Sequence, residues 1–191
     1  MLSLAEIGPA LYGAWRLAHF DPKGMGYFDR SLEGFWRSFR VSILVAPLWA
    51  AIVAMDVSEM KTTGGWFNIL AGESIAYVIG WAAFPLLAFY LTEFVDRRSQ
   101  YLGFIVAYNW SSVIQLALFF PVRLILHSGI LPNGLVLLII YAVQIGLLVY
   151  EWFIVRTALN LPGLGAAGIV AIDVFISYLT NHFGDAIAQG G

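Results

Sequence analysis

The chain contains no cysteine and few charged side chains, and both scarcities limit what kind of protein it can be. Without cysteine there is no disulfide, no thiolate metal site and no cysteine nucleophile. Charged residues make up only 12% of the 191 residues, whereas hydrophobic residues make up 60%. A soluble domain needs a charged exterior, which this composition cannot supply. The composition therefore predicts an integral membrane protein.

The sequence also lacks the motifs of common catalytic and ligand-binding sites. It has no Gly-rich phosphate loop, no nucleophile elbow and no paired-histidine helix. His19, His127 and His182 lie in three separate regions, without other ligands at metal-binding spacing. A net charge of -2 gives no positive field that would attract nucleic acid. We expect a protein that is not an enzyme, holds no metal or other cofactor and does not bind nucleic acid.

Long apolar segments fill the chain from residue 41 onward. A helix needs roughly 20 mainly apolar residues to cross the hydrocarbon core of a membrane. The runs are continuous, whereas the strands of a membrane barrel alternate polar and apolar residues. We therefore predict an all-α polytopic fold with five transmembrane helices in a domain of residues 41–183. The expected spans are 41–55, 69–94, 101–126, 134–155 and 163 to about 178 or 183.

The basic residues lie mostly on one side of this five-span arrangement. Eight of the ten Lys and Arg fall in the N-terminal segment or in the loops after the second and fourth spans. Because positive residues are retained on the cytoplasmic side, the N-terminus should be cytoplasmic and the C-terminus periplasmic. The expected location is a bacterial inner membrane. Residues 184–191 are expected to form a flexible tail.

Residues 1–40 form an expected amphipathic segment at the membrane interface. Aromatic side chains next to basic ones favour the headgroup region of a bilayer. One interpretation is a helical anchor that leads into the first span, and the other is a docking platform for a partner or for anionic lipid. The platform residues are Arg30, Trp36, Arg37, Phe39 and Arg40.

Polar side chains inside the spans are candidates for a functional site, because burying them in lipid is costly. Asp173 lies about 15 Å along the fifth span, near the bilayer midplane. Gln115 and Gln144 lie at similar depths on the third and fourth spans, and Asn109 lies nearer the cytoplasm. These four residues are expected to form either interhelical hydrogen bonds or a proton relay or cation site.

A second pair of charged residues lies nearer the outer ends of the spans. Glu73 is one turn inside the second span, and Arg123 is near the end of the third. Two adjacent antiparallel helices can bring such residues together as an ion pair, which offsets their desolvation. The pair is expected to be structural, with a substrate clamp as the alternative.

Small residues recur every four positions on two spans, and such stripes let helices approach closely. The expected packing faces serve either within the subunit or at a homodimer interface. They consist of Gly72, Ala76 and Gly80 on the second span and Gly163, Ala167 and Ala171 on the fifth.

The layout resembles that of the Ypt-interacting protein (Yip) family. The residues that carry the resemblance are Tyr108, Asn109 and Trp110 in the third span, together with the spacing of spans two to five. The resemblance covers residues 40–183 and implies a cytosolic N-terminal segment followed by five helices. The Asp-Leu-Tyr-Gly-Pro motif of the eukaryotic members is missing, so no trafficking role is implied. The chain also resembles small uncharacterised bacterial inner-membrane proteins.

Two functions follow from these observations as hypotheses. The first is a non-catalytic membrane protein that acts through interaction, as a homo-oligomer or as an accessory subunit of a membrane complex in contact with lipid. The second is a small transporter or channel component with a polar site centred on Asp173.

Overall fold

A computed structural model describes residues 4–59 and 66–188, and all regular structure within these residues is helical. A proline or glycine lies at or near several of the boundaries, including Pro22, Gly129 and Gly163. The elements in chain order are α1 (Leu4–Ala18), η1 (Pro22–Tyr27), α2 (Leu32–Ser38), α3 (Val41–Glu59), α4 (Trp66–Phe94), η2 (Arg98–Gln100), α5 (Tyr101–Ser128), α6 (Asn133–Leu159) and α7 (Gly163–Ala188).

The protein is an integral membrane protein with the predicted five-span, all-α architecture. Five stretches within residues 4–59 and 66–188 are helical, long and apolar enough to cross a membrane. The first of them joins α2 to α3, and each stretch is longer than the sequence predicts. The stretches are Leu32–Val57, Trp66–Phe94, Arg98–Ser128, Gly134–Leu159 and Gly163–Ala188.

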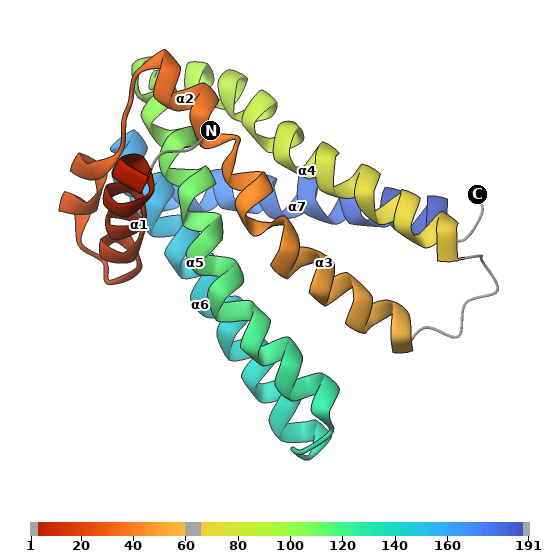
Figure 1. Ribbon diagram of the computed structural model, residues 1–191. Helices are drawn as coiled ribbons and strands as arrows, with labels where there is room; N and C mark the ends of the chain where they lie inside the picture. The colour runs from red at the N-terminus through yellow and green to blue at the C-terminus, as the bar shows by residue number, and fades with distance from the viewer. Residues whose placement is uncertain (1–3, 60–65, 189–191) are drawn as a thin grey trace.

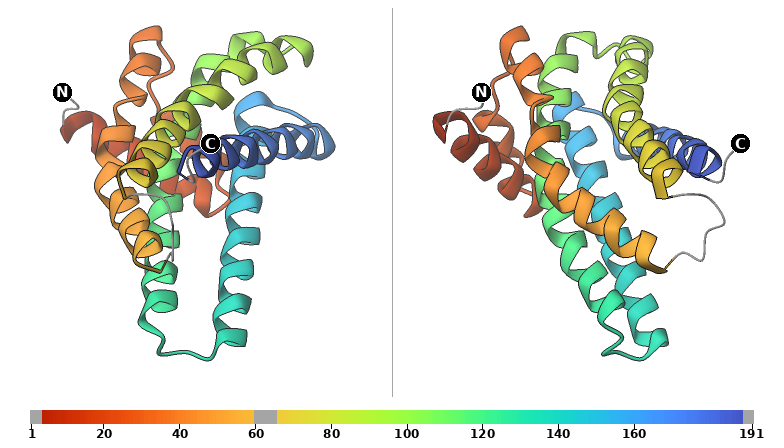
Figure 2. Two further views of the ribbon diagram at one scale, coloured as in Figure 1. Left: turned by 90° about the vertical axis from the view of Figure 1, so that its right-hand side faces the viewer. Right: turned by 45° about the vertical axis from the view of Figure 1, so that its right-hand side comes forward.

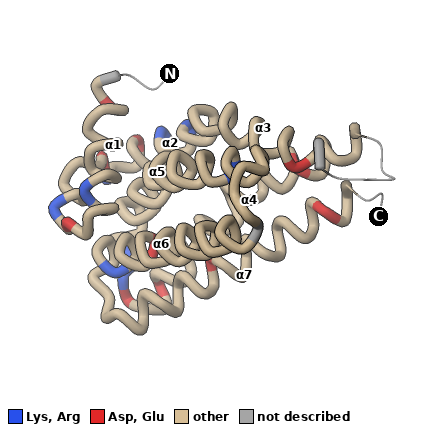
Figure 3. Tube along the Cα trace, turned by 90° about the horizontal axis from the view of Figure 1, so that it is seen from below, with Lys and Arg blue, Asp and Glu red and all other residues tan. Residues whose placement is uncertain are grey.

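The spans diverge from one end of the molecule. Helix α4 packs along α7, α5 packs along α6, and α3 packs against α5. In two orientations the α5–α6 hairpin and the α4–α7 pair separate progressively away from α1 and α2 (Figures 1 and 2). We call the end that carries α1 and α2 the near end and the opposite end the far end. Basic residues gather at the near end (Figure 3).

The α4–α7 contact depends on small residues, but not on the set that the sequence predicts. A Cβ atom on Gly72 would collide with the carbonyl oxygen of Gly184, and one on Gly184 would lie 2.8 Å from the Cβ atom of Ala76. Gly72 and Ala76 therefore do pack closely against α7. A Cβ atom on Gly80, in contrast, would have no neighbour within 4 Å.

The partner of Gly72 on α7 is a residue that the sequence interpretation placed in a tail. Helix α7 continues to Ala188, so residues 184–188 are helical and Gly184 is buried in the contact with α4. The predicted tail is wrong for these residues, and residues 189–191 lie outside the described part of the chain. Ala167 and Ala171 are exposed, and Gly163 instead contacts Trp152 of α6.

The N-terminal helices pack onto the spans and share their core. Ala10, Ala14 and Leu17 of α1 are buried against α5 and its neighbours. Helix α1 also packs closely on η1, where a Cβ atom on Gly13 would lie 2.9 Å from the carbonyl oxygen of Gly24. The part of residues 1–40 that the structure describes is thus continuous with the membrane domain, and its interfacial position stays a prediction.

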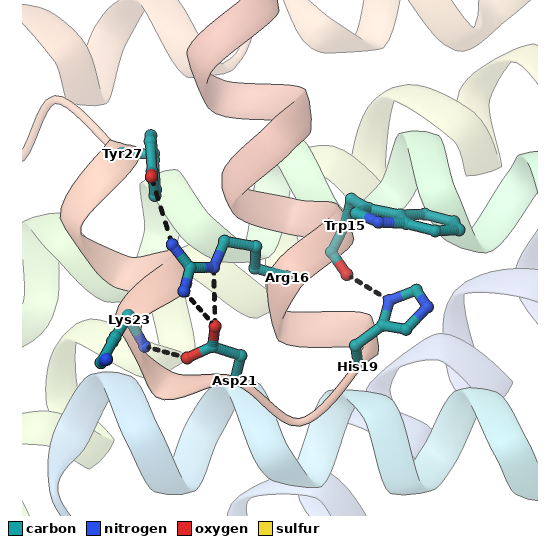
Figure 4. A network of polar contacts seen from close by, with 6 residues as sticks. All are labelled: Trp15, Arg16, His19, Asp21, Lys23 and Tyr27. Atoms are coloured by element: carbon teal, nitrogen blue, oxygen red, sulfur yellow. Dashed lines mark hydrogen bonds and ion pairs between the residues drawn. The ribbon is translucent and has the colours of Figure 1, made fainter.

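A polar network holds the turn between α1 and η1 (Figure 4). Arg16 donates from Nε to Asp21 Oδ2 at 2.7 Å, and the Lys23 backbone N–H donates to Asp21 Oδ1 at 3.0 Å. Arg16 also donates to the Tyr27 hydroxyl at 3.2 Å. The hydrogen bonds from Lys23 and Arg16 lower the pKa of Asp21, and the hydrogen bond to Asp21 raises the pKa of Arg16. This network fixes the direction in which η1 returns toward the spans.

Candidate intramembrane polar site

A cavity of about 410 Å³ lies between α3, α4, α5 and α7. We call it the polar crevice, because most of its lining side chains carry a polar group at membrane depth. It is lined by Trp49, Glu73, Ala76, Tyr77, Gly80, Trp81, Tyr108, Asn109, Ser112, Gln115, Ser177 and Asn181. The lining includes one carboxyl group and no Lys, Arg or His. Its electrostatic character therefore favours a cation or a neutral solute over an anion.

The far end of the polar crevice is acidic. Glu73 lines the crevice near the start of α4, and Asp185 near the end of α7 acts on it electrostatically. The two carboxyl groups come together because Gly72 and Gly184, their immediate chain neighbours, allow the two helices to approach closely. Negative charge at this end favours the entry of a cation.

Tyr108 connects the polar crevice to a carboxyl group buried behind it. The Tyr108 side chain lines the crevice, and its hydroxyl donates to Asp173 Oδ2 at 3.0 Å. The ring is held by Phe84 at 4.9 Å and Phe104 at 6.2 Å between ring centroids. Asp173 itself is 5% exposed and does not line the crevice. The Tyr108 ring therefore lies between the crevice and Asp173, and its hydrogen bond connects the two.

Glu151 of α6 is the second carboxyl group at this position. Its side chain lies within hydrogen-bond reach of Asp173, and it is 8% exposed. One oxygen of each acid, Glu151 Oε1 and Asp173 Oδ1, has no hydrogen-bond partner. Neither carboxyl forms an ion pair with any Lys or Arg of the described residues. Two acids therefore share one buried position without a balancing charge.

The sequence interpretation missed Glu151 as a partner of Asp173. A signal was present, because α6 and α7 are joined by a short turn and the two acids lie at similar separations from Leu161. Antiparallel helices place such residues at the same depth. What the sequence could not show is that both residues face the same side of the hairpin.

The structure brings together only part of the predicted polar site. Gln115 and Asn109 line the polar crevice, whereas Gln144 lines a neighbouring cavity of about 350 Å³ that Gln115 also borders. Asn109 donates from Nδ2 to the Ser38 hydroxyl at 2.9 Å, and this bond attaches α5 to α2. Asp173 is thus linked to the crevice through Tyr108, a residue that the predicted site did not include.

The predicted ion pair between Glu73 and Arg123 is wrong. Arg123 pairs with Asp56 of α3 instead, and Glu73 lies beside Asp185. The reason is that α5 packs along α3 at this depth, while α4 follows α7 away from α5. The sequence interpretation therefore misidentified the helix that neighbours Arg123.

Two arginines of the predicted interfacial platform are engaged within the chain. Arg37 forms ion pairs with Glu6 and Glu33, and Arg30 donates to the Met25 carbonyl at 2.6 Å. Phe39 is half-buried and packs on Phe35 with ring centroids 5.2 Å apart. Arg30, Trp36 and Arg40 are exposed.

A metal site needs several donor groups in one place. Among the described residues, no three His, Asp or Glu side chains gather closely enough to bind a metal ion. The oxygen atoms that do converge within the membrane are those of Glu151, Asp173 and Tyr108. This arrangement can hold a proton and form hydrogen bonds.

The fold and this site define a helical membrane protein with a buried carboxyl pair beside a polar crevice. No family model, curated protein or solved structure was found to match the chain. The resemblance to the Yip family therefore stays a prediction.

Proposed function

We propose that this chain is a membrane transport component in which the polar crevice admits a small cation toward Asp173. The observation that carries this proposal is the position of Tyr108, a residue that lines the crevice and whose hydroxyl donates to Asp173 Oδ2 at 3.0 Å. An ionisable group inside a membrane is costly, and it is usually placed on an ion or proton pathway. Here the acid is connected to a polar cavity through one side chain.

The charges around the polar crevice support a cationic substrate. Glu73 and Asp185 place negative charge at its far end, and no basic residue lines it. At the near end, α1 packs on α5 and α6, and α2 packs on α5. In the proposed topology, with the N-terminus in the cytoplasm of a bacterial cell, the crevice is accessible from the periplasmic side.

Reconstitution into liposomes tests this function. A potassium gradient with valinomycin imposes a negative interior potential, and an enclosed pH-sensitive dye reports proton entry. Uptake of Na⁺ and K⁺ is measured with radioactive tracers in separate liposomes that contain no valinomycin. We expect the purified chain to transport one of these cations faster than protein-free liposomes, and Asp173→Asn to abolish the excess flux. Glu93→Gln, which alters an exposed acid paired with Arg98, should retain it. Wild-type flux equal to that of empty liposomes for all three cations contradicts the proposal.

A second function is favoured by the uncovered face of α7. Ala167 and Ala171 are exposed. Small residues at this spacing allow a second helix to approach closely, so this face is available for contact with another helix. We propose that the chain acts as a homo-oligomer or as an accessory subunit through this face. The Yip-like layout agrees with a role in interaction.

Light scattering of the detergent-solubilised protein tests the second function. We expect a mass above that of one 21.1 kDa chain, and a return to the monomer mass in Ala167→Leu/Ala171→Leu. Phe183→Leu, a change at an exposed position on another face of the same helix, should have no effect. A strict monomer that retains no other protein argues against this role.

A further inference from the structure

We propose that Glu151 and Asp173 together bind a single exchangeable proton, which reaches them from the polar crevice through the Tyr108 hydroxyl. This inference rests on the proposed function, because it names the proton as the cation that the crevice admits. It goes further in assigning a binding role to Glu151 and a conducting role to Tyr108.

The first observation is the state of the four carboxyl oxygens. Both acids are more than nine-tenths buried, and their side chains are within hydrogen-bond reach of each other. Asp173 Oδ2 accepts from Tyr108, whereas Asp173 Oδ1 and Glu151 Oε1 have no partner. A buried acceptor without a donor is unfavourable. One added proton supplies a donor at this position. It turns one carboxylate into a carboxylic acid, whose O–H group donates a hydrogen bond to the other carboxylate.

The second observation is the lack of a compensating charge. The groups that act on the pair are the two acids themselves and the Tyr108 phenol of α5. Within the described residues, no charged side chain of α1, α3 or α4 is paired with either acid. The Tyr150 phenol, next to Glu151 in the chain, is directed to the carbonyl of Ala14 instead. Two adjacent negative charges in a region of low permittivity repel strongly, so the pair retains one proton.

The third observation is the route. In the exchange step, the Tyr108 O–H bond breaks as its proton passes to Asp173 Oδ2, and a hydronium ion in the crevice replaces that proton on the phenol oxygen. The net change is one proton moved from crevice water to the carboxyl pair, with the phenol restored. On the near side, Asn109 donates to Ser38 and Tyr150 donates to Ala14, so neither side chain donates to the carboxyl pair. The proton therefore exchanges with the polar crevice in this conformation.

Infrared spectroscopy of the full chain in lipid bilayers measures this proton directly. A protonated carboxyl group has a C=O stretching band that a carboxylate lacks, and the band shifts when H₂O is replaced by D₂O. We expect the wild type to show this band at neutral pH and Glu151→Gln/Asp173→Asn to lose it, while Glu93→Gln keeps it. Tyr108→Phe should keep the band but slow its shift in D₂O by at least tenfold.

Isotope labelling supplies a second measurement that needs no variant. Carboxyl ¹³C labelling of all Asp, or of all Glu, in the wild-type chain should move the band, because the proton is shared between one residue of each type.

Absence of the band in the wild type overturns the inference, and so does its loss in Glu73→Gln. Appearance of the band only when Na⁺ is removed also overturns it and assigns the site to Na⁺.

The infrared experiment and the liposome experiment distinguish the failure of the proton site from the failure of the transport function. If the band behaves as expected but no cation is transported, the carboxyl pair binds a proton and the transport function is wrong. If cations are transported and Asp173→Asn abolishes the flux, but the band is absent, then the transport function stands and the proton site is wrong.

Discussion

The hydroxyl of Tyr150 donates a 2.8 Å hydrogen bond to the carbonyl oxygen of Ala14, which joins the fourth span to the first helix of the chain. Both groups are buried, and the two residues are 136 positions apart in the sequence. Together with the bond from Asn109 to Ser38, it attaches α1 and α2 to the later spans. The N-terminal segment is therefore a structural part of the membrane domain.

Removing the Tyr150 hydroxyl should weaken this attachment. Tyr150→Phe keeps the ring but removes the donor, and we expect it to destabilise the protein by about 1 kcal/mol, which is typical of one buried hydrogen bond. Thermal unfolding in detergent measures the change. Tyr90→Phe removes the hydroxyl of an exposed tyrosine and should have no comparable effect. Equal stability of the two variants would show that the bond from Tyr150 contributes nothing.

Two glycines of α4 provide a matched test of the contact with α7. Gly72→Ala places a methyl group against the backbone of Gly184, so we expect a loss of about 1–3 kcal/mol from overpacking. Gly80→Ala meets no neighbour within 4 Å and should leave stability unchanged or raise it by up to about 1 kcal/mol through better helix propensity. Unfolding in a denaturing detergent measures both. The opposite order would contradict the α4–α7 packing.

Asp21 should make stability dependent on acid pH. Hydrogen bonds from the Lys23 backbone N–H and from Arg16 lower the pKa of Asp21 in the folded state below its ordinary value of 3.8. The stabilisation is therefore present above pH 3.8 and is lost as the pH falls through the lower folded pKa. We expect wild type to be more stable than Asp21→Asn near neutral pH and the difference to shrink as the pH falls below 3.8.

The measurement is a set of thermal unfolding curves for both proteins between pH 2 and 7. Asp96→Asn, a change of an exposed acid in the turn after α4, corrects for the general effect of removing one carboxylate. A stability difference between wild type and Asp21→Asn that stays constant across this range would exclude the proposed linkage.

A double-mutant cycle distinguishes the observed partner of Arg123 from the predicted one. Asp56→Asn and Arg123→Gln should be coupled by about 0.5–1 kcal/mol, because the two side chains form an ion pair that is partly exposed. Glu73→Gln and Arg123→Gln should instead be additive within about 0.5 kcal/mol. Coupling in the second cycle and additivity in the first would restore the pairing predicted from the sequence.

The proposed topology is open to a fusion test. Under the five-span arrangement, eight of the ten basic residues lie on the same side of the membrane as the N-terminus. We therefore expect alkaline phosphatase fused to the C-terminus to be active in the periplasm. Green fluorescent protein fused after Arg98 should fluoresce in the cytoplasm. An inactive phosphatase would place both ends of the chain on the same side and would require an even number of spans.

Much of the fold follows from local properties of the chain. The five spans are recognisable because each contains a continuous apolar run, and the polar breaks between them are short. Asp173 was identified as a candidate because a carboxyl group in the middle of an apolar run needs no structure to be noticed. The end of α7 was misjudged because residues 184–191 were interpreted as one flexible tail from their final Ala-Gln-Gly-Gly, whereas Gly184 forms a helix contact.

The sequence by itself determined the membrane location, the number of spans and the depth of the polar residues, since these depend on composition along one helix at a time. Only the tertiary structure decided which helices are neighbours, and hence that Arg123 meets Asp56 and that Asp173 meets both Tyr108 and Glu151. The physical reason is that apolar spans differ little in hydrophobicity around their circumference. Their rotation and partners are set by side-chain packing, such as the approach of Gly72 to Gly184, rather than by any pattern readable along a single span.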